Sequence, residues 1–146
     1  MRDSKSPPRG NCLRQGRTSE HGRLYLITTV TRSRKPLFAN FALARTTIAT
    51  LYTDKRVATM AYVLMPDHLH WIFELKRGTL STVVGAMKSV SARQHGGPMW
   101  QPGFHDHALR REEDIQKVAR YLIANPLRAG LVDCIGDYPH WDAVWL

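Results

Sequence analysis

Apolar positions along the chain follow two different spacings, and the two alternate from one segment to the next. β-branched and aromatic runs predict four strands, at residues 24–31, 57–65, 68–75 and 104–110. Apolar residues three and four positions apart predict three helices, which begin after Asn40, after Gly78 and at Glu112. We expect Pro126 to end the third helix and residues 129–146 to pack as irregular structure.

The order of these elements favours an α+β domain. Pro66 and Asp67 form a turn between two strands, which predicts a hairpin, and two longer connections contain helices. We therefore expect an antiparallel sheet of the ferredoxin-like type with helices packed on it. The chain of 146 residues is predicted to form a single domain, residues 23–146, preceded by a flexible basic arm at residues 1–22.

Positive charge is concentrated towards the N-terminus of a chain whose formal net charge is +9. Residues 1–56 contain 12 Lys and Arg against 3 Asp and Glu, whereas residues 57–146 contain 9 of each kind. This asymmetry indicates a polyanionic partner, for which we favour nucleic acid. A solubilising basic surface is one alternative. An anionic membrane is another, although the basic segment contains no amphipathic helix rich in Trp and Leu.

The composition excludes several classes of protein. No apolar run approaches the roughly 20 residues of a membrane helix, and the N-terminal segment lacks the apolar stretch of a secretory signal. Cys12 and Cys134 make neither a disulfide framework nor a four-ligand zinc site. We therefore expect a reduced, cytoplasmic protein without membrane association.

Residues 68–75, with the sequence HLHWIFEL, contain the clearest candidate for chemistry. Side chains alternate along a strand, so the odd-numbered positions form an apolar face and His68 and His70 lie together on the other face. Two imidazoles placed in this way are able to bind one metal ion. The alternative is an exposed polar face with two incidental histidines. His105 and His107 repeat the spacing, but the residue between them is an aspartate, so no core-facing anchor separates them.

The third predicted helix contributes a second candidate pair. Tyr121 and Asn125 are one helical turn apart, on the flank of an apolar stripe. The pair either faces a cleft or covers the edge of the core, and spacing alone favours the second interpretation. The stripe consists of Ile115, Val118, Ala119, Leu122 and Ile123.

Several segments together resemble a known family. They are TTVTRSRKPLF at 28–38, MPDHLH at 65–70, WQPGF at 100–104, LR at 109–110 and YLIANPLRAGLV at 121–132. Their combination resembles the single-tyrosine HUH transposases of the IS200-like group, and within that group the REP-associated tyrosine transposases. The resemblance spans roughly residues 13–146. The family often has Asn where this chain has Asp67, and a carboxylate there is able to act on the metal through a histidine.

This resemblance implies the fold of an HUH nuclease, a metal site and a nucleophile. His68 and His70 would bind a divalent cofactor, Mg²⁺ or Mn²⁺, and Asn125 would add its amide oxygen. Tyr121 would attack a phosphodiester, form a 5′-phosphotyrosyl link and release a 3′-OH. Because that 3′-OH is able to reverse the reaction, the same site would both cut and rejoin DNA.

The implied substrate is single-stranded DNA folded as a hairpin, such as a repetitive extragenic palindrome, and not a small molecule. The protein would act in the bacterial cytoplasm, on the nucleoid. REP-associated members are monomeric whereas other IS200-like relatives pair, so a monomer is favoured and a dimer is the alternative. The cations expected to contact DNA are Arg14, Arg17, Arg23, Arg32, Arg34, Lys35, Lys88 and Arg93.

Two other functions stay open at the level of sequence. One is a phosphodiesterase in which a metal held by His68 and His70 activates water while Tyr121 is incidental. The other is a catalytically idle protein that binds hairpin DNA. A covalent protein–DNA adduct distinguishes the transposase from both.

Overall fold

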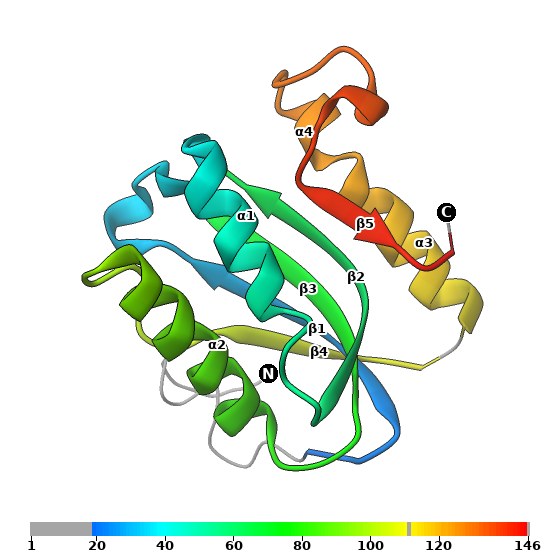
Figure 1. Ribbon diagram of the computed structural model, residues 1–146. Helices are drawn as coiled ribbons and strands as arrows, with labels where there is room; N and C mark the ends of the chain where they lie inside the picture. Colours follow the sequence, from blue (N-terminus) through cyan, green and yellow to red (C-terminus); the bar gives the residue numbers. More distant parts are fainter. Residues whose placement is uncertain (1–18, 111, 146) are drawn as a thin grey trace.

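A five-stranded antiparallel sheet lies at the centre of the protein, which the computed structural model describes over residues 19–110 and 112–145 (Figure 1). The strands lie in the order β4-β1-β3-β2-β5, with the predicted hairpin between β2 and β3. This arrangement confirms the expected α+β class. The strands are β1 (Arg23–Val30), β2 (Val57–Met65), β3 (His68–Leu75), β4 (His105–Leu109) and β5 (Trp141–Ala143).

Helices cover both faces of the sheet, α1 and α2 on one side and α3 with α4 on the other (Figure 1). Asn40 caps α1 as predicted, because its Oδ1 accepts a hydrogen bond of 3.0 Å from Leu43 N. Thr79 caps α2 through a reciprocal pair of hydrogen bonds with Thr82. No helix in the described part of the chain is long and apolar enough to span a membrane. The helices are α1 (Phe41–Thr50), α2 (Leu80–His95), α3 (Glu112–Ile123) and α4 (Asn125–Arg128).

The alternation along β3 assigns its two faces to two different cores. One face packs against α1 and α2, where Trp71 is fully buried and donates Nε1 to Thr59 Oγ1 over 3.0 Å. On the other face, Ile72 packs with Val63 of β2 and Leu122 of α3. Side chains two residues apart share a face, so His68 and His70 lie on the side that α3 covers. The residues of the first face are Leu69, Trp71, Phe73 and Leu75.

Of two expectations about the C-terminal part, one is confirmed and one was wrong. The third helix, α3, ends at Ile123, ahead of Pro126 as predicted, and Pro126 lies in the first turn of the separate short helix α4, where its missing N–H has no helical partner to lose. The residues after it are not irregular throughout, because Trp141–Ala143 pair with β2 as strand β5. A free edge of β2 would expose unpaired backbone groups, and this pairing satisfies them.

The boundary of the predicted arm also changes. Residues 1–18 lie outside the described part of the chain, whereas residues 19–22 make hydrogen bonds with the domain. Ser19 Oγ accepts from Leu80 N over 3.1 Å, and Gly22 N donates to Leu75 O over 2.7 Å. These four residues therefore belong to the domain and not to the arm.

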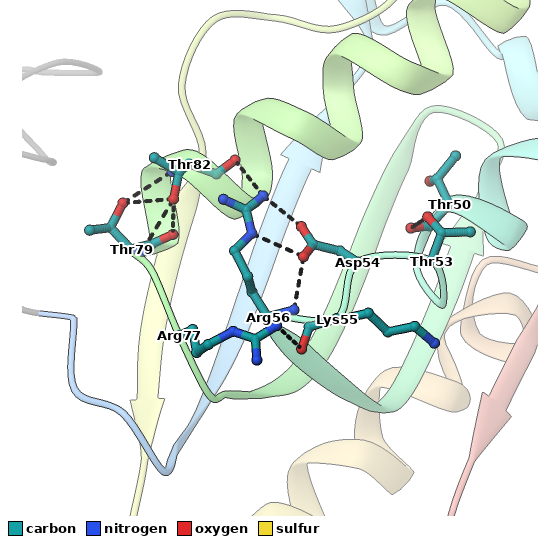
Figure 2. Close-up of polar contacts among 8 residues, drawn as sticks. All are labelled: Thr50, Thr53, Asp54, Lys55, Arg56, Arg77, Thr79 and Thr82. Carbon is teal, nitrogen blue, oxygen red and sulfur yellow. Dashed lines mark hydrogen bonds and ion pairs between the residues drawn. The ribbon is translucent and has the colours of Figure 1, made fainter.

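Asp54 fixes the turn that leads into β2 (Figure 2). Arg56 donates its backbone N and its Nε to Asp54 Oδ1, over 2.9 and 3.0 Å, and its Nη2 to Oδ2 over 2.7 Å. The same Nη2 lies 3.5 Å from Thr82 O, which connects the turn to α2. Burial opposes ionisation of the carboxylate, but the hydrogen bonds and charge of Arg56 prevail and hold the pKa of Asp54 below its usual range.

We predict that Asp54→Asn lowers the free energy of unfolding by about 1–2 kcal/mol at pH 7. A lowered folded-state pKa contributes stability above the unfolded value of about 3.9, and this contribution is lost as the pH falls through the folded value. Urea unfolding of the two proteins should therefore differ at pH 7 and converge near pH 2. Asp133→Asn, at an exposed position, should change stability little at either pH. A deficit of Asp54→Asn that is the same at both pH values would contradict the ionic role.

Candidate active site

His68 and His70 lie side by side at the beginning of β3. Their ring centroids are 4.9 Å apart and the rings meet edge to face, at 83°. The strand backbone sets this separation, and Trp71 and Leu69 hold the strand from the opposite face. Two imidazoles fixed at this distance are able to serve as a pair of nitrogen ligands for one metal ion.

Each histidine is oriented by a hydrogen bond at Nδ1. His68 Nδ1 lies 2.7 Å from Asp67 Oδ1, and His70 Nδ1 lies 2.9 Å from Thr28 Oγ1 of β1. The ionised Asp67 carboxylate only accepts, so it favours the His68 tautomer with the proton on Nδ1 and a lone pair on Nε2. The Thr28 hydroxyl is able to donate or accept, so it orients the His70 ring without selecting its tautomer. In both rings Nε2 is the atom that would bind a metal.

The electrostatic environment favours neutral imidazole at His70. Burial, together with the neighbouring His68, lowers the pKa of His70 to about 4. Burial alone would raise the pKa of Asp67, but hydrogen bonds and charge from His68 and Arg34 hold it below its usual range. Neutral imidazole is the form in which His70 would bind a metal, and an ionised Asp67 is the form that accepts a hydrogen bond from His68 Nδ1.

A basic loop follows β1 and packs against the turn before His68. Arg34 Nε lies 3.2 Å from Asp67 Oδ2, and Thr31 Oγ1 donates to Asp67 O over 3.1 Å. Ser33 and Arg34 have φ values of 55° and 51°, a left-handed conformation that costs a residue with a side chain about 1–3 kcal/mol. The hydrogen bonds to the turn hold this strained loop, so Arg34 lies beside the carboxylate that contacts His68.

A pocket of about 330 Å³ opens beside this loop. Arg32 and Lys35 line one side of it, and His95 at the end of α2 lines another. Arg32, Arg34 and Lys35 are exposed, as the predicted contact with DNA phosphates requires.

The remaining predicted DNA-contacting residues are in different situations. Arg23 Nη1 forms an ion pair of 2.7 Å with Glu20, and Lys88 Nζ donates to Gln101 O over 2.8 Å and also to Gly103 O. Lys88 therefore holds the loop that precedes β4, whatever else it contacts. Arg93 is exposed on the last turns of α2, and Arg14 and Arg17 lie outside the described residues.

Tyr121 and Asn125 lie on neighbouring turns at the junction of α3 and α4. The Tyr121 side chain is 65% exposed, although α3 itself is anchored to the sheet by Leu122 and Ile123. Arg128 stacks its guanidinium 3.8 Å above the centroid of the Tyr121 ring and donates Nη2 to Tyr121 O over 2.6 Å. The same Nη2 donates to Asn125 Oδ1. An exposed phenol at a helix–helix junction is accessible to a macromolecular substrate.

The described side chains provide only some of the ligands that a divalent ion would need. Among residues 19–110 and 112–145, no three His, Cys, Asp or Glu side chains gather as a metal site. The imidazoles of His68 and His70 would supply two nitrogen ligands, and a further protein ligand among the described residues would be of another type. Asn125 Oδ1 is chemically suitable, and in this structure it accepts a hydrogen bond from Arg128.

Sequence reasoning missed Thr28 and Arg128. Thr28 lies opposite His70 in the β1–β3 pairing, and its other neighbour in the sheet, on β4, is His105. His105 therefore shares the sheet face of His70, two strands away, which the spacing of the histidines did not indicate. Arg128 belongs to the segment that carries the family resemblance, and its position one turn beyond Asn125 was the available signal.

Comparisons with known proteins are consistent with this geometry. The chain is 28% identical over 132 residues to the REP-associated tyrosine transposase of Escherichia coli (strain K12), covering 83% of this chain and 80% of that protein. It also resembles a solved structure of a REP-associated tyrosine transposase bound to a REP hairpin. The TM-score is 0.76 at 25% identity, covering 94% of this chain and 82% of that one. The family model described as "Transposase IS200 like" matches residues 21–125, and the chain therefore belongs to the IS200-like transposase family.

Proposed function

We propose that this transposase cleaves and rejoins single-stranded DNA at hairpin sequences, through a covalent link to Tyr121 and with the help of a divalent metal ion. The observation that carries the proposal is the paired imidazoles of His68 and His70, each held at Nδ1 so that Nε2 is free to bind. A structural relative bound to a REP hairpin supports hairpin DNA as the substrate. A palindrome of the same type is the substrate we propose for this chain.

Tyr121 is the proposed nucleophile. Its phenolic oxygen attacks the scissile phosphorus, a P–O bond to tyrosine forms, and the P–O3′ bond of the DNA breaks. The phenol loses one proton and the departing 3′ oxygen gains one, which leaves a 5′-phosphotyrosine and a free 3′-OH. Because the number of phosphodiester-type bonds is unchanged, attack by a 3′-OH on the tyrosyl phosphate rejoins DNA without an external energy source.

The histidines, with Asn125, would hold Mg²⁺ or Mn²⁺, which when bound polarises the scissile phosphate and offsets the charge that develops there. Asp67 and Thr28 fix the two rings, so that little conformational freedom is lost on binding. Arg32, Arg34 and Lys35 bind the phosphates that flank the reacting one. Their loop is hydrogen-bonded to the turn that precedes His68, so DNA held by these cations lies close to the metal ligands.

We predict that Tyr121→Phe abolishes cleavage and adduct formation and leaves hairpin affinity nearly unchanged. The substitution removes one oxygen from an exposed ring and leaves the buried side of α3 intact. The measurement combines a denaturing gel with a labelled hairpin oligonucleotide and Mn²⁺, and a binding titration under the same conditions. Tyr52→Phe, at another exposed tyrosine, is the matched control and should retain activity. Adduct formation by Tyr121→Phe at a rate near that of the wild type would refute the assignment.

We predict that His68→Ala and His70→Ala each abolish cleavage, because the remaining ligands hold a hard cation poorly. Asn125→Ala should weaken metal use and be partly rescued by excess Mn²⁺. His105→Ala should reduce cleavage much less, although it lies on the same sheet face. Cleavage rates over a Mn²⁺ titration, with EDTA as the blank, test this. Full activity in EDTA would rule out the metal site.

We predict that deletion of residues 1–18 leaves the melting temperature nearly unchanged and weakens hairpin binding. These residues contain five Lys and Arg against one Asp, so they are expected to contact phosphates. The loss of affinity should shrink as salt concentration rises, because released counterions supply part of the binding free energy. If the arm also contacts bases, the truncated protein should discriminate less between a cognate hairpin and one with altered flanks. If the truncated and full-length proteins have equal affinity and equal discrimination at low salt, residues 1–18 act only as a solubilising segment.

A further inference from the structure

Arg128 contacts both of the residues that the proposed chemistry takes from the helical segment. Its guanidinium carbon lies 3.8 Å from the centroid of the Tyr121 ring, and its Nη2 donates both to Tyr121 O and to Asn125 Oδ1. The Arg128 guanidinium therefore stacks on the proposed nucleophile and also occupies the oxygen that is proposed to bind the metal. Nothing in the reaction described above uses this side chain.

The Arg128 contact and metal binding compete for the same atom. The amide oxygen of Asn125 would have to bind a divalent cation, yet in this structure it accepts a hydrogen bond from a guanidinium. A guanidinium and a divalent cation cannot both occupy one amide oxygen, because the two positive groups repel each other. Asn125 Oδ1 would therefore be available to a metal ion only after Arg128 has moved off it.

A DNA phosphate is the group best suited to draw the Arg128 guanidinium away from Asn125 Oδ1. The guanidinium matches a phosphate with two parallel N–H donors, and a hydrogen bond to a charged oxygen is roughly twice as strong as one to a neutral amide. Arg128 is exposed, so DNA that reaches Tyr121 also reaches this guanidinium. The exchange replaces a neutral acceptor by an anionic one.

We propose that Arg128 is a positioning residue that holds Asn125 Oδ1 in the DNA-free protein and releases it when a DNA phosphate binds the guanidinium. This inference rests on the proposed function, because it concerns the same metal and the same nucleophile. In the DNA-free state Arg128 weakens metal binding. In the DNA-bound state it holds the phosphate next to Tyr121, so that the complete metal site forms where substrate is present.

The first test measures Mn²⁺ binding to the full-length, DNA-free protein by isothermal titration calorimetry. Arg128→Ala frees Asn125 Oδ1, so we expect Mn²⁺ to bind about 3- to 10-fold more tightly than to the wild type. Arg120→Ala is the matched control, since it removes an exposed arginine from the same helical segment, and it should leave the affinity unchanged. Arg128→Gln, which keeps a long polar side chain, should also tighten binding and guards against a local folding defect in the alanine variant.

A double-mutant cycle then tests whether the effect passes through Asn125. When Asn125 is already replaced by Ala, a further Arg128→Ala should no longer tighten Mn²⁺ binding, because the contested oxygen is gone. An unchanged benefit of Arg128→Ala in that background would overturn the proposed competition, as would an Arg128→Ala protein that binds Mn²⁺ no more tightly than the wild type.

The second test uses hairpin DNA. Arg128→Ala should form the covalent adduct at least about 10-fold more slowly at saturating Mn²⁺, because the phosphate beside Tyr121 loses its charged partner. The variant would thus bind metal better and react worse, whereas a merely structural role would impair both. Adduct formation at the wild-type rate would refute the DNA-bound half of the proposal.

A reference variant separates this proposal from the proposed function. If His68→Ala binds Mn²⁺ as well as the wild type does, the metal site itself is wrong. If His68→Ala no longer binds Mn²⁺ and Arg128→Ala binds it with unchanged affinity, the proposed metal site is supported and the proposed role of Arg128 is refuted.

Discussion

The strict alternation of side chains along β3 is the constraint on which the site depends. Trp71 and the apolar residues in register with it are fully buried beneath α1 and α2, so the strand has one orientation in the sheet. A shift of one residue would place both histidines in the core beneath α1 and α2 and move four large apolar side chains out of it, which makes the register unambiguous. His68 and His70 are therefore fixed on the opposite face by the same packing that stabilises the domain. The pairing of the two histidines is a consequence of the core and needs no separate scaffold.

Neighbouring side chains fix the orientation of the two imidazole rings. Asp67 and Thr28 come from the turn and the strand next to β3, and each orients one imidazole from its Nδ1 side. Arg34 connects the Asp67 carboxylate to the basic loop after β1, so His68, Asp67 and Arg34 form one hydrogen-bonded unit. On the same face, α3 packs on β2 through Leu122 and leaves the Tyr121 side chain exposed.

Sequence reasoning found the parts that depend on local periodicity. Four of the strands, the starts of three helices and the opposite faces of β3 follow from local sequence patterns, and the structure confirms them. It failed where the outcome depends on pairing between distant segments. Strand β5 forms because the edge of β2 is open, and Thr28 meets His70 because β1 pairs with β3 in one register. Arg128 was missed for a related reason. Helical spacing predicts that Arg128 lies near Asn125, but it does not predict that Arg128 donates a hydrogen bond to Asn125 Oδ1.

The central claim is that the face of the sheet carrying the histidine pair works together with Tyr121 to make a covalent bond to DNA. The most direct measurement is peptide mapping of the protein after reaction with a hairpin oligonucleotide and Mn²⁺. Trypsin cleaves after Arg120 and Arg128, so Tyr121 lies in a peptide of residues 121–128 that contains no other tyrosine. The account predicts that this peptide carries the mass of the downstream DNA fragment through its 5′ phosphate. Cleaved DNA with an unmodified 121–128 peptide, or with the DNA attached to another residue, would contradict it.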